Sequence, residues 1–529
     1  MRKTLLLIII SIFAITAIAQ PVVTFSNLRY WTPSELAPYV GQTIRLSQPW
    51  HINSVQSGSV YGGPRRSFSP TNIALPGSSD YDRICYVNNS GLVRMSGLGF
   101  TPRMGEMLTN LVVTVNSTTS VTVVGSPQRH FTYSELNTPP NVGKRDEIVL
   151  VCCMNLCYFL VENLGSGSQG PTSSSQQTLQ YSKIIDALTA IDADIYGFVE
   201  IEQGQGALQK LAQGLTHALG RQFSYINDGL SASGTWTKAG YVYCTDRIER
   251  VGSMVNVNTG VKNRKKLQTF RDKASGESFV LGINHFKAKV NGPSSGIDAD
   301  QGDGQGAYNN ARKVEAQAVL SSINTNLSTL SDPDILLMGD LNAYAKEDPI
   351  RVFTDAGYRD LHEMFHADTA YSYVYTYGEY TAGYLDHALA NSSMAAQVCG
   401  AAAWHINSDE PYNKSYRYSA ADNSKFRCSD HDPILVGIKL GDYHANNRTS
   451  FDSPEASIPI ELTVEGGNYI LRGATKGYLR IYSVTGVLEV NMPIDSDELI
   501  IPTSGLPQGI HIINAYGGHS TLQAKIIVR

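Results

Sequence analysis

The stretch Asp334-Ile-Leu-Leu-Met-Gly-Asp-Leu-Asn-Ala-Tyr344 decides how the middle of this chain is interpreted. Its apolar run predicts a fully buried strand that ends at Gly339. Asp340 and Asn342 follow two residues apart, so extended backbone would place both side chains on the same side. A carboxylate and a carboxamide held together there suit chemistry on a hard metal ion, a phosphate or a water. The alternative is a strand ending in an ordinary polar turn, where Asp and Asn are common.

Polar groups of the same kinds follow other apolar runs in the middle of the chain. They are Asn155, Glu200, the pair Asn284-His285, the pair Asp386-His387 and the stretch Ser429-Asp-His-Asp-Pro433. Because ligands and catalytic groups gather at strand ends in sheet proteins, we expect all of these side chains to share one cleft. Taken singly, each has an ordinary structural alternative, such as a loop cap, a surface ion pair, a core histidine or a turn. A chance origin for all of them together is the weaker hypothesis.

The chemistry of these groups indicates a divalent cation and proton transfer. Oxygen donors suited to Mg²⁺, Mn²⁺ or Ca²⁺ rather than zinc are offered by Glu200, Asp430, Asp340 and Asn155. His285 and His431 titrate near neutral pH, so they are candidates for the acid and the base. No Cys-x-x-Cys pair is present that would indicate a zinc site.

Helical and strand patterns alternate from about Asp146 to about Leu440. The expected strands are 148–154, 195–199, 240–244, 279–284, 334–338 and 434–438, and the expected helices are 181–191, 208–219 and 311–323. A polar loop is expected at 165–177. The pattern predicts an α/β or α+β domain of enzyme size, here given the bounds 146–440.

The flanking regions have a different pattern, with short β-type runs separated by Gly, Pro, Asn and Ser. Residues 20–133 predict an all-β barrel or sandwich without helical periodicity, and 134–145, which contains Thr138-Pro-Pro-Asn-Val-Gly143, predict a linker. Residues 441–457 predict a second linker, and 458–529 predict a small β-sandwich without a catalytic cluster. A chain of 529 residues is expected to hold more than one such domain.

The first residues predict export. Arg2 and Lys3 precede an apolar run that closes with Ala17-Ile-Ala19, which together describe a signal peptide over residues 1–19. The alternative, a membrane anchor, requires a longer apolar run. No later stretch is long and apolar enough to span a membrane, so we expect a secreted or cell-surface protein without stable membrane insertion.

The net charge gives little general attraction to nucleic acid. Loss of the leader would remove two cations and no acid, leaving 40 Lys and Arg against 47 Asp and Glu, a net charge of −7. A nucleic-acid-binding protein of this charge would depend on local basic patches and on metal. One candidate patch is Lys262-Asn-Arg-Lys-Lys266 followed by Arg271 and Lys273, although a solvated hairpin face is the more common origin of such a run.

The seven cysteines are an odd number, so at least one is unpaired or pairs between chains. Export would permit disulfides, and Cys399 with Cys428, which flank a long polar loop, form the favoured pair. Cys152, Cys153 and Cys157 lie in or beside an apolar strand, where buried thiols are the alternative.

The motifs at these strand ends, taken together, resemble those of a known enzyme superfamily. The middle of the chain resembles the endonuclease/exonuclease/phosphatase superfamily, the fold of DNase I-like nucleases, and more narrowly the secreted bacterial nucleases of the ExeM/NucH type. The resemblance covers most of 146–440 and implies a four-layer α/β sandwich. Besides Asn155, its motifs are Ala193-Asp-Ile-Tyr-Gly-Phe-Val-Glu-Ile-Glu202, Gly282-Ile-Asn-His-Phe-Lys-Ala-Lys289, Gly304-Gln-Gly-Ala-Tyr-Asn-Asn-Ala-Arg312, Met338-Gly-Asp-Leu-Asn-Ala-Tyr344, Gly383-Tyr-Leu-Asp-His-Ala-Leu389 and Ser429-Asp-His-Asp-Pro433.

The resemblance also implies a role for each matching residue. For the metal and the phosphate these are Glu200 as metal-binding carboxylate, Asn155 and Asp430 completing the metal and phosphate site, and Arg312 and Lys287 as further phosphate contacts. For the reaction they are Asp340 and Asn342 orienting water and scissile phosphate, His431 beside them with Asp386 as its orienting partner, and His285 protonating the leaving oxygen. Two departures from the family pattern, the low-complexity loop 165–177 and Cys152-Cys-Met-Asn155, bear on metal affinity and substrate preference.

The terminal regions carry resemblances of their own. The N-terminal stretches Gln42-Thr-Ile-Arg-Leu46, Gly63-Pro-Arg-Arg-Ser-Phe-Ser-Pro-Thr-Asn72 and Arg83-Ile84 resemble the OB-like accessory domain of the same nucleases. The C-terminal stretches Leu479-Arg-Ile-Tyr-Ser-Val-Thr-Gly486, Leu506-Pro-Gln-Gly-Ile510 and Lys525-Ile-Ile-Val-Arg529 resemble the sorting domain of Bacteroidetes type IX secretion substrates. That resemblance implies the export machinery as a partner.

The leading hypothesis is a secreted, monomeric, divalent-metal-dependent endonuclease that hydrolyses extracellular DNA, with RNA as an alternative polymer. The cofactor expected from the oxygen donors is Mg²⁺, with Mn²⁺ or Ca²⁺ as alternatives. A second hypothesis is another phosphoesterase on the same fold, such as a sphingomyelinase-like enzyme or an inositol-phosphate hydrolase. A third, a surface-binding protein with a decayed active site, is disfavoured because the set of site residues is complete.

Overall fold

The computed structural model describes residues 20–441 and 461–528, apart from 57, 167–168, 233–236, 261–262, 367–368, 377–379 and 419–421 in the first range and 466–467, 474–476, 484–487, 495, 497, 502–505 and 518–519 in the second. These residues form two compact units, divided between Gly441 and Asp442. The predicted signal peptide and residues 442–457 of the predicted second linker lie outside the described residues. Within the described part, no helix is both long and apolar enough to cross a membrane.

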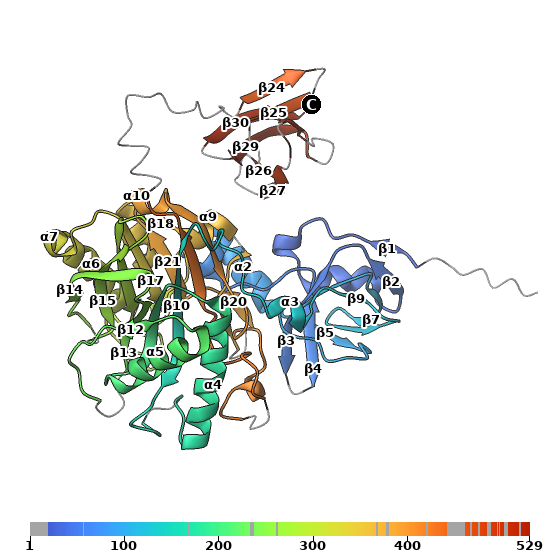
Figure 1. Cartoon of the computed structure of the whole chain (residues 1–529). Coiled ribbons are helices and arrows are strands. Elements are labelled where there is room, and N and C mark those ends of the chain that lie inside the picture. Colours follow the sequence, from blue (N-terminus) through green and yellow to red (C-terminus); the bar gives the residue numbers. More distant parts are fainter. Residues whose placement is uncertain are drawn as a thin grey trace, which may run out of the picture. The chain divides into compact units, whose positions relative to one another are not determined.

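Two six-stranded sheets form the middle of the first unit (Figure 1). The first has the order β12-β13-β11-β10-β23-β22, with strands β12 Phe223–Tyr225, β13 Thr237–Cys244, β11 Ile195–Glu202, β10 Val149–Phe159, β23 Ile434–Ile438 and β22 Val398–Ala403. The second has the order β14-β15-β16-β17-β21-β18, with strands β14 Ile248–Asn256, β15 Lys265–Asp272, β16 Ser278–His285, β17 Ile335–Asp340, β21 Asp386–Ala390 and β18 Arg359–Asp360.

The two sheets pack face to face, and helices cover their outer faces. Alternate residues of the strands, such as Val151 and Ile195 in one sheet and Leu281 and Met338 in the other, form one buried apolar cluster between the sheets. The outer face of the first sheet packs on α4 Ser174–Ile191 and α5 Gly206–Leu219, and that of the second on α6 Asn309–Thr325, α7 Leu327–Leu330 and α8 Asp348–Asp355. The predicted four layers of helix, sheet, sheet and helix are therefore present.

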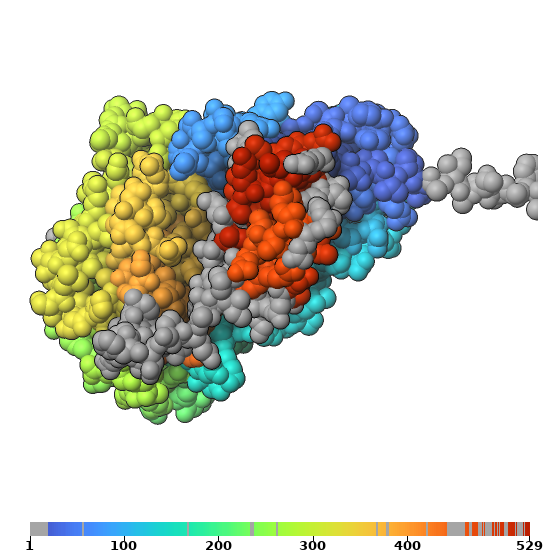
Figure 2. All heavy atoms as spheres, turned by 90° about the horizontal axis from the view of Figure 1, so that it is seen from above, coloured from blue at the N-terminus to red at the C-terminus, as the bar shows by residue number. Residues whose placement is uncertain are grey.

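Shorter elements surround these layers. They are α9 Leu361–His366, α10 Ser392–Ala395, η4 Tyr412–Lys414 and the two-stranded sheet of β19 Tyr373–Tyr375 and β20 Thr381–Gly383. In the space-filling view, the yellow and amber atoms of the stretch from α6 to α9 form one continuous patch of surface (Figure 2).

Helix α4 is longer than the helix predicted over 181–191. Helix α4 begins seven residues before the expected start, because the Ser173 side chain accepts a hydrogen bond from the Gln176 N–H and caps the first turn. The helix ends with Asp192 in a left-handed conformation. The predicted loop over 165–177 therefore ends earlier than expected.

The lysine run was expected as a basic surface patch or a solvated hairpin face, and the structure contradicts both for two of its members. Lys265 and Lys266 are fully buried in β15. The ammonium of Lys265 lies 2.8 Å from Glu315 Oε1, and that of Lys266 pairs with Asp228. The two side chains are consecutive in the strand and point to opposite faces of the sheet, and on each face a carboxylate compensates the buried charge. Lys262 lies outside the described residues.

The N-terminal part contains one nine-stranded sheet. Its order is β1-β2-β7-β8-β5-β4-β3-β6-β9, with strands β1 Val22–Val23, β2 Thr43–Leu46, β7 Val112–Ser117, β8 Ser120–Val123, β5 Val93–Ser96, β4 Ser59–Gly63, β3 Trp50–Gln56, β6 Met107–Thr109 and β9 Gln128–Arg129. A separate apolar cluster that includes Trp31, Trp50 and Val113 forms its core. The 11-residue helix α2, Ser79–Asn89, was not expected from the sequence, and the other helical turns are η1 Leu28–Tyr30, η2 Pro33–Tyr39, α1 Pro70–Ile73 and α3 Tyr133–Leu136.

The N-terminal sheet is joined to the two central sheets by buried polar contacts. Arg66 lies 2.6 Å from Asp409 Oδ1, and Arg103 pairs with both Asp409 and Glu410. Phe68 forms a parallel β-bridge with Ala382, close before β21. The N-terminal part is therefore attached to the segment that leads into the candidate site.

The second unit consists of two small antiparallel sheets. One has the order β24-β25-β28 and the other β27-β26-β29-β30, with strands β24 Glu461–Glu465, β25 Asn468–Arg472, β28 Glu498–Ile500, β27 Leu488–Ile494, β26 Gly477–Ser483, β29 Gly509–Gly517 and β30 Ser520–Val528. A buried cluster that includes Leu471, Ile481 and Ile513 forms its core.

The favoured disulfide is absent from the structure. Cys428 is a buried thiol whose Sγ lies 3.4 Å from Asn407 Oδ1 and which packs in the same apolar cluster as Cys152. Cys399, by contrast, is exposed on β22. The two cysteines flank the loop in sequence, but one faces the core and the other faces solvent.

Candidate active site

Three of the predicted residues lie side by side at one edge of the second sheet, where β16 and β17 end and β21 begins. His285 ends β16 and is in register with Asp340 at the end of the parallel strand β17. Asp340 is in turn in register with Asp386, the first residue of the antiparallel strand β21. All three side chains are almost completely buried. The second sheet thus presents an imidazole and two carboxylates in one row at one edge.

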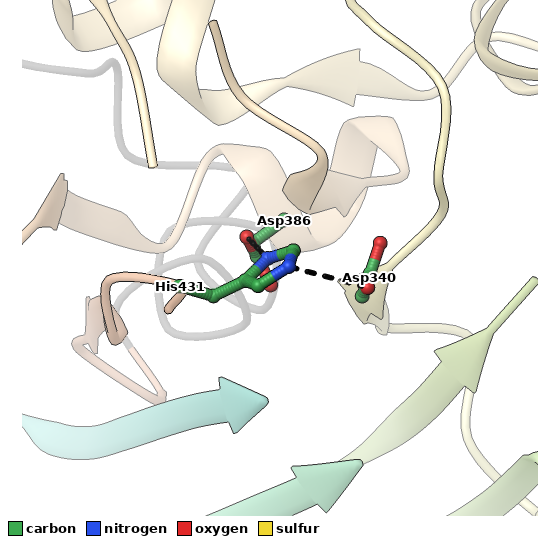
Figure 3. Close-up of side chains that lie close together, drawn as sticks. All are labelled: Asp340, Asp386 and His431. Atoms are coloured by element: carbon green, nitrogen blue, oxygen red, sulfur yellow. Dashed lines mark hydrogen bonds and ion pairs between the residues drawn. The ribbon is translucent and has the colours of Figure 1, made fainter. Parts of the chain in front are cut away.

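His431 and Asp386 form a hydrogen-bonded pair that faces Asp340 (Figure 3). His431 Nδ1 lies 2.7 Å from Asp386 Oδ2, and the other ring nitrogen, Nε2, lies 3.9 Å from Asp340 Oδ2. Ser372 Oγ donates a second hydrogen bond of 2.7 Å to Asp386 Oδ2, and the Tyr373 ring packs on the imidazole with centroids 4.7 Å apart. The pair is therefore held in one orientation from three sides.

The carboxylates around His431 set its charge. Burial alone would lower the pKa of the imidazole, but Asp386, Asp340 and Asp430 outweigh burial and raise the pKa well above its ordinary value. Burial raises the pKa of Asp340 to about 6, against the opposing effect of His431. At neutral pH the site accordingly holds a charged imidazole beside a carboxylate that titrates near neutrality.

Asn155 links the first sheet to this row. Its Nδ2 donates a 3.1 Å hydrogen bond to Asp340 Oδ2, and its Oδ1 accepts one of 2.9 Å from the Cys157 N–H. Ser429 Oγ donates a 2.7 Å hydrogen bond to the Asn155 backbone carbonyl, which ties the stretch before His431 to β10. The ends of strands in two different sheets are thereby joined through side chains.

Asn342 reaches the site in a different way from the one predicted. Strand β17 ends at Asp340, and Asn342 has a left-handed backbone with φ +49°, so the alternation of an extended strand does not continue to it. Instead, its N–H donates a 2.9 Å hydrogen bond to Asp340 Oδ1, and its Nδ2 donates one of 3.2 Å to the Phe286 carbonyl. A turn closed by the aspartate side chain brings the two residues together.

Glu200 belongs to the first sheet and lies across from His285. Its backbone is left-handed, with φ +55°, at a register shift between β11 and β13. Glu200 Oε1 lies 3.8 Å from His285 Nε2. Burial, together with the charges of Asp430 and Asp340, raises the pKa of Glu200 to about 8. The positive charges of His431 and Arg264 lower the pKa of Glu200, but by less than burial and the carboxylates raise it.

His285 is the second imidazole at this edge. Its Nε2 lies 3.7 Å from Asp340 Oδ2, the same oxygen that faces His431. Burial and the positive charges of Arg264 and His431 lower its pKa well below the ordinary value. Its Nδ1 is buried and has no hydrogen-bond partner among the described residues. The two histidines therefore face the same carboxylate with pKa values that are shifted in opposite directions.

The donor set is consistent with a divalent cation. Glu200, Asp430 and the amide oxygen of Asn155 are hard oxygen donors, and a cation would stabilise the charged form of Glu200, which burial and then Asp430 and Asp340 disfavour. Asp340, Asp386 and His431 also lie close enough to hold an ion, because their nearest ligand atoms are all within 4.8 Å of one another. Since His431 Nδ1 and Asp386 already bond each other, the oxygen set is the better match to Mg²⁺.

Lys287 and Arg312, the two predicted phosphate contacts, differ in burial and in the groups that surround them. Lys287 is half-buried near the site, and its positive charge contributes to the lowered pKa of His285. Arg312 is fully buried, and its guanidinium donates to the carbonyls of Ala307, Gln305 and Lys287. The Arg312 side chain thus braces the loop before α6, and its contact with a phosphate stays a prediction.

Three residues of the site were not singled out from the sequence. Arg264 precedes β15, and its charge acts on both Glu200 and His285, yet in the sequence it was only one member of a basic run. Ser372 and Tyr373 contact Asp386 and His431 from a tyrosine-rich stretch without a recognisable motif. Only the tertiary contacts reveal the roles of these two residues.

Other buried polar side chains hold the backbone next to the row of His285, Asp340 and Asp386 in place. His387 Nε2 lies 2.7 Å from the Ala343 carbonyl, and its Nδ1 lies 3.5 Å from Asp360 Oδ2. Tyr384 also donates to Asp360, and His362 Nε2 lies 3.0 Å from the backbone carbonyl of Asp386. His387 thus fixes the turn after Asp340 and does not enter the site itself.

Comparison with known proteins identifies the fold. The model of the Endonuclease/Exonuclease/phosphatase family matches residues 163–431, just over half of the chain. No curated protein sequence matches the chain.

Solved structures similar to this chain include the endonuclease/exonuclease/phosphatase from Bacteroides vulgatus, with 16% identity, a TM-score of 0.38, and coverage of 55% of this chain and 99% of that chain. The mannosyl-6-phosphatase of Bacteroides thetaiotaomicron has 19% identity, a TM-score of 0.36, and coverage of 54% and 98%. D. rerio TDP2 complexed with single strand DNA product has 15% identity, a TM-score of 0.37, and coverage of 55% and 99%.

Proposed function

We propose, since this chain belongs to the Endonuclease/Exonuclease/phosphatase family, that it is a divalent-metal-dependent endonuclease that hydrolyses phosphodiester bonds in DNA. The family comprises hydrolases, among them phosphoesterases and nucleases, and is typically dependent on divalent metal. The proposal concerns the narrower choice of a nucleic acid polymer as substrate.

One observation carries the proposal: two imidazoles of opposite proton affinity converge on a single carboxylate oxygen. His285 Nε2 and His431 Nε2 lie 3.7 Å and 3.9 Å from Asp340 Oδ2. Hydrolysis of a phosphodiester needs a group that takes a proton from water and a group that gives one to the leaving oxygen. Titratable groups whose environments separate their pKa values are typical of such acid and base pairs.

The residues divide the reaction between them. Asp340, with its pKa of about 6, orients the attacking water and accepts its proton, and Asn155 and Asn342 hold that carboxylate in place. His431, kept charged by Asp386, stabilises the negative charge that develops on the phosphoryl oxygens.

His285 is assigned the proton for the leaving oxygen. It is neutral in the structure because its pKa is lowered, but a bound phosphodiester brings negative charge that raises the pKa of the imidazole. A divalent cation held by Glu200, Asp430 and the Asn155 amide oxygen would neutralise phosphate charge and polarise the phosphoryl oxygen.

Two regions outside the site support a polymer substrate and an extracellular location. The N-terminal sheet attaches directly before β21 through the Phe68–Ala382 bridge, so a long substrate would meet both parts. The leader predicted for residues 1–19 and the sorting-domain resemblance of the C-terminal β-unit support export by a type IX machinery in a Bacteroidetes bacterium. The nuclease would then act on extracellular DNA.

Plasmid cleavage tests the proposal. Supercoiled and linear plasmid DNA are incubated with the full chain and Mg²⁺, Mn²⁺ or Ca²⁺, with EDTA as the metal-free control. His431→Ala and Asp340→Ala are compared with His217→Ala and Asp355→Ala, which change exposed residues outside the site. We expect metal-dependent nicking of closed circles that both site variants lose and both control variants retain.

A failure of this experiment has a clear meaning. If neither DNA nor RNA is cleaved with any of the three metals, the nuclease proposal is wrong. Sphingomyelin and inositol phosphates are then the substrates to assay, because they carry the phosphoester bonds of the alternative hypothesis.

A further inference from the structure

A cavity of about 430 Å³ lies where the N-terminal part of the chain meets the segment that leads to Asp386. Its walls carry three cations and two aromatic rings from elements far apart in the sequence: Arg29, Arg65, Arg66, Phe68 and Tyr371. Thr369, also part of the wall, is exposed, so the cavity opens to solvent on that side. No residue of the catalytic row lines it.

Arg65 is the distinctive group in this cavity. Its guanidinium donates to Asn88 Oδ1 at 3.0 Å and to the Arg66 carbonyl at 3.4 Å, both neutral acceptors. Within the described part of the chain no carboxylate pairs with it, whereas Arg29 pairs with Asp80 and Arg66 with Asp409. Burial and the neighbouring Arg29 lower the pKa of Arg65 to about 10, the direction expected for a buried cation that only neutral groups accept from. A half-buried cation of this kind favours an anion from outside the protein.

Tyr371 connects the cavity to the catalytic residues along the chain. Tyr371 directly precedes Ser372, which bonds Asp386, and lies two residues before Tyr373, which packs on His431. Arg66 lies over the Tyr371 ring, with the guanidinium carbon 5.4 Å from the ring centre. Arginines together with aromatic faces are the combination that proteins use along a nucleic acid strand, for the phosphates and for stacking.

We propose that this cavity binds a backbone phosphate of the nucleic acid strand outside the scissile bond, with Arg65 as the principal contact. The proposal rests on the nuclease function proposed above and extends it, because it assigns substrate positioning to the N-terminal part of the chain. A strand held at both Asp340 and Arg65 would bind more tightly than a small phosphodiester, which occupies the catalytic row alone.

Binding without cleavage tests the contact directly. The probe is a fluorescein-labelled single-stranded DNA of 20 nucleotides, titrated with the full chain in EDTA and followed by fluorescence anisotropy at several salt concentrations. For Arg65→Gln we expect roughly tenfold weaker binding and a salt slope of log Kd that is smaller by about 0.7, the value for one lost phosphate contact on a single strand. Arg65→Lys should retain most of the slope, because it retains the charge.

Two controls separate the cavity from general electrostatics and from misfolding. Arg45→Gln removes an exposed arginine of β2 that does not line the cavity and should leave the salt slope unchanged. Thr369→Glu places a negative charge at the exposed rim and should weaken binding, whereas Thr369→Gln should not. Because Thr369 is exposed, this pair remains informative even if Arg65→Gln does not fold. Equal salt slopes for wild type, Arg65→Gln and Thr369→Glu would overturn the proposal.

Cleavage kinetics distinguish this proposal from the nuclease proposal. Arg65→Gln should raise KM for the 20-nucleotide strand by roughly tenfold and change kcat/KM for bis(p-nitrophenyl) phosphate by less than about twofold. Equal effects on both substrates would show that Arg65 has no role in strand binding. If the wild type cleaves the small diester but no nucleic acid, the nuclease proposal is wrong. The cavity proposal is then tested by the anisotropy titrations alone.

Discussion

Asn155 Nδ2 lies 3.1 Å from Asp340 Oδ2, so one hydrogen bond joins the end of β10 in the first sheet to the end of β17 in the second. Asp340 is also the carboxylate on which His285 and His431 converge. The relative position of the two sheets is thereby coupled to the orientation of the group proposed to handle the attacking water.

Asn155→Ala should therefore lower kcat for DNA cleavage by roughly a hundredfold, because Asp340 loses the donor that orients it. The measurement is steady-state cleavage of a fluorogenic oligonucleotide, with thermal unfolding as a check on folding. Asn116→Ala, at an exposed position of β7, is the matched control and should keep full activity. An unchanged kcat for Asn155→Ala would contradict the coupling.

Asp386→Asn should lower kcat by roughly 10²- to 10⁴-fold, since His431 loses the carboxylate that orients and charges it. The acidic neighbours raise the pKa of His431, so removing one of them lowers that pKa. The limb of the pH-rate profile that reports His431 should accordingly move to lower pH. Ser372→Ala, which leaves the carboxylate but removes one donor to it, should lower kcat by only about tenfold. A pH profile that does not move in Asp386→Asn would assign the limb to another group.

Metal affinity should rise with pH. Glu200 has a pKa of about 8 in the metal-free structure, so at pH 6 it carries a proton that must leave before the carboxylate can bind a cation. Between pH 6 and 8 the Mg²⁺ affinity is expected to increase by up to about tenfold per pH unit. Titration calorimetry in buffers of different ionisation enthalpy measures both the affinity and the protons released. Glu200→Gln should bind Mg²⁺ more weakly and with a flatter pH dependence, and a pH-independent wild type would refute the assignment.

Gly339→Ala should destabilise the fold severely. Gly339 has φ +135°, and a Cβ there would collide with the backbone carbonyl of Asn284 in the neighbouring strand β16. Backbone strain and the steric clash together are expected to lower the free energy of unfolding by about 3 kcal/mol or more. Gly63→Ala, where an added Cβ meets only ordinary contacts with Trp31, should change it by less than about 1 kcal/mol. Urea denaturation of the two variants decides between strain and a general intolerance of substitution.

Arg103→Met should weaken the attachment of the N-terminal sheet to the rest of the first unit. The variant leaves Lys414 as the remaining cation of Glu410 and Arg66 as the remaining cation of Asp409. Because each carboxylate keeps one cation but loses charged hydrogen bonds, the free energy of unfolding is expected to fall by about 2–3 kcal/mol. Chemical denaturation measures the loss, and Arg94→Met, at an exposed position of β5, is the control. A loss below about 1 kcal/mol would show that the ion pairs contribute little to stability.

The strands that matter for the site could be predicted because each is a short apolar run with an abrupt polar end. Ile195–Val199 followed by Glu200 and Ile335–Met338 followed by Asp340 show this pattern, and the structure places both ends at the candidate site. Helix α2 could not be predicted, because its own apolar pattern is weak and only Ile84 and Val87 are buried along it. The buried Lys265 and Lys266 misled the charge analysis for a related reason, since their partners Glu315 and Asp228 are distant in sequence.

The sequence by itself determined which residue types stand at the strand ends, because an apolar run that stops at a polar residue is visible in local composition and spacing. Tertiary structure alone decided which of these groups meet. It places Asp340 between two histidines, bonds Arg312 to the carbonyls of the loop before α6, and brings Ser372 and Arg264 to the catalytic groups. The physical reason is that these contacts depend on strand register and on the packing of one sheet against the other, which sum over many distant residues and leave no local trace in the chain.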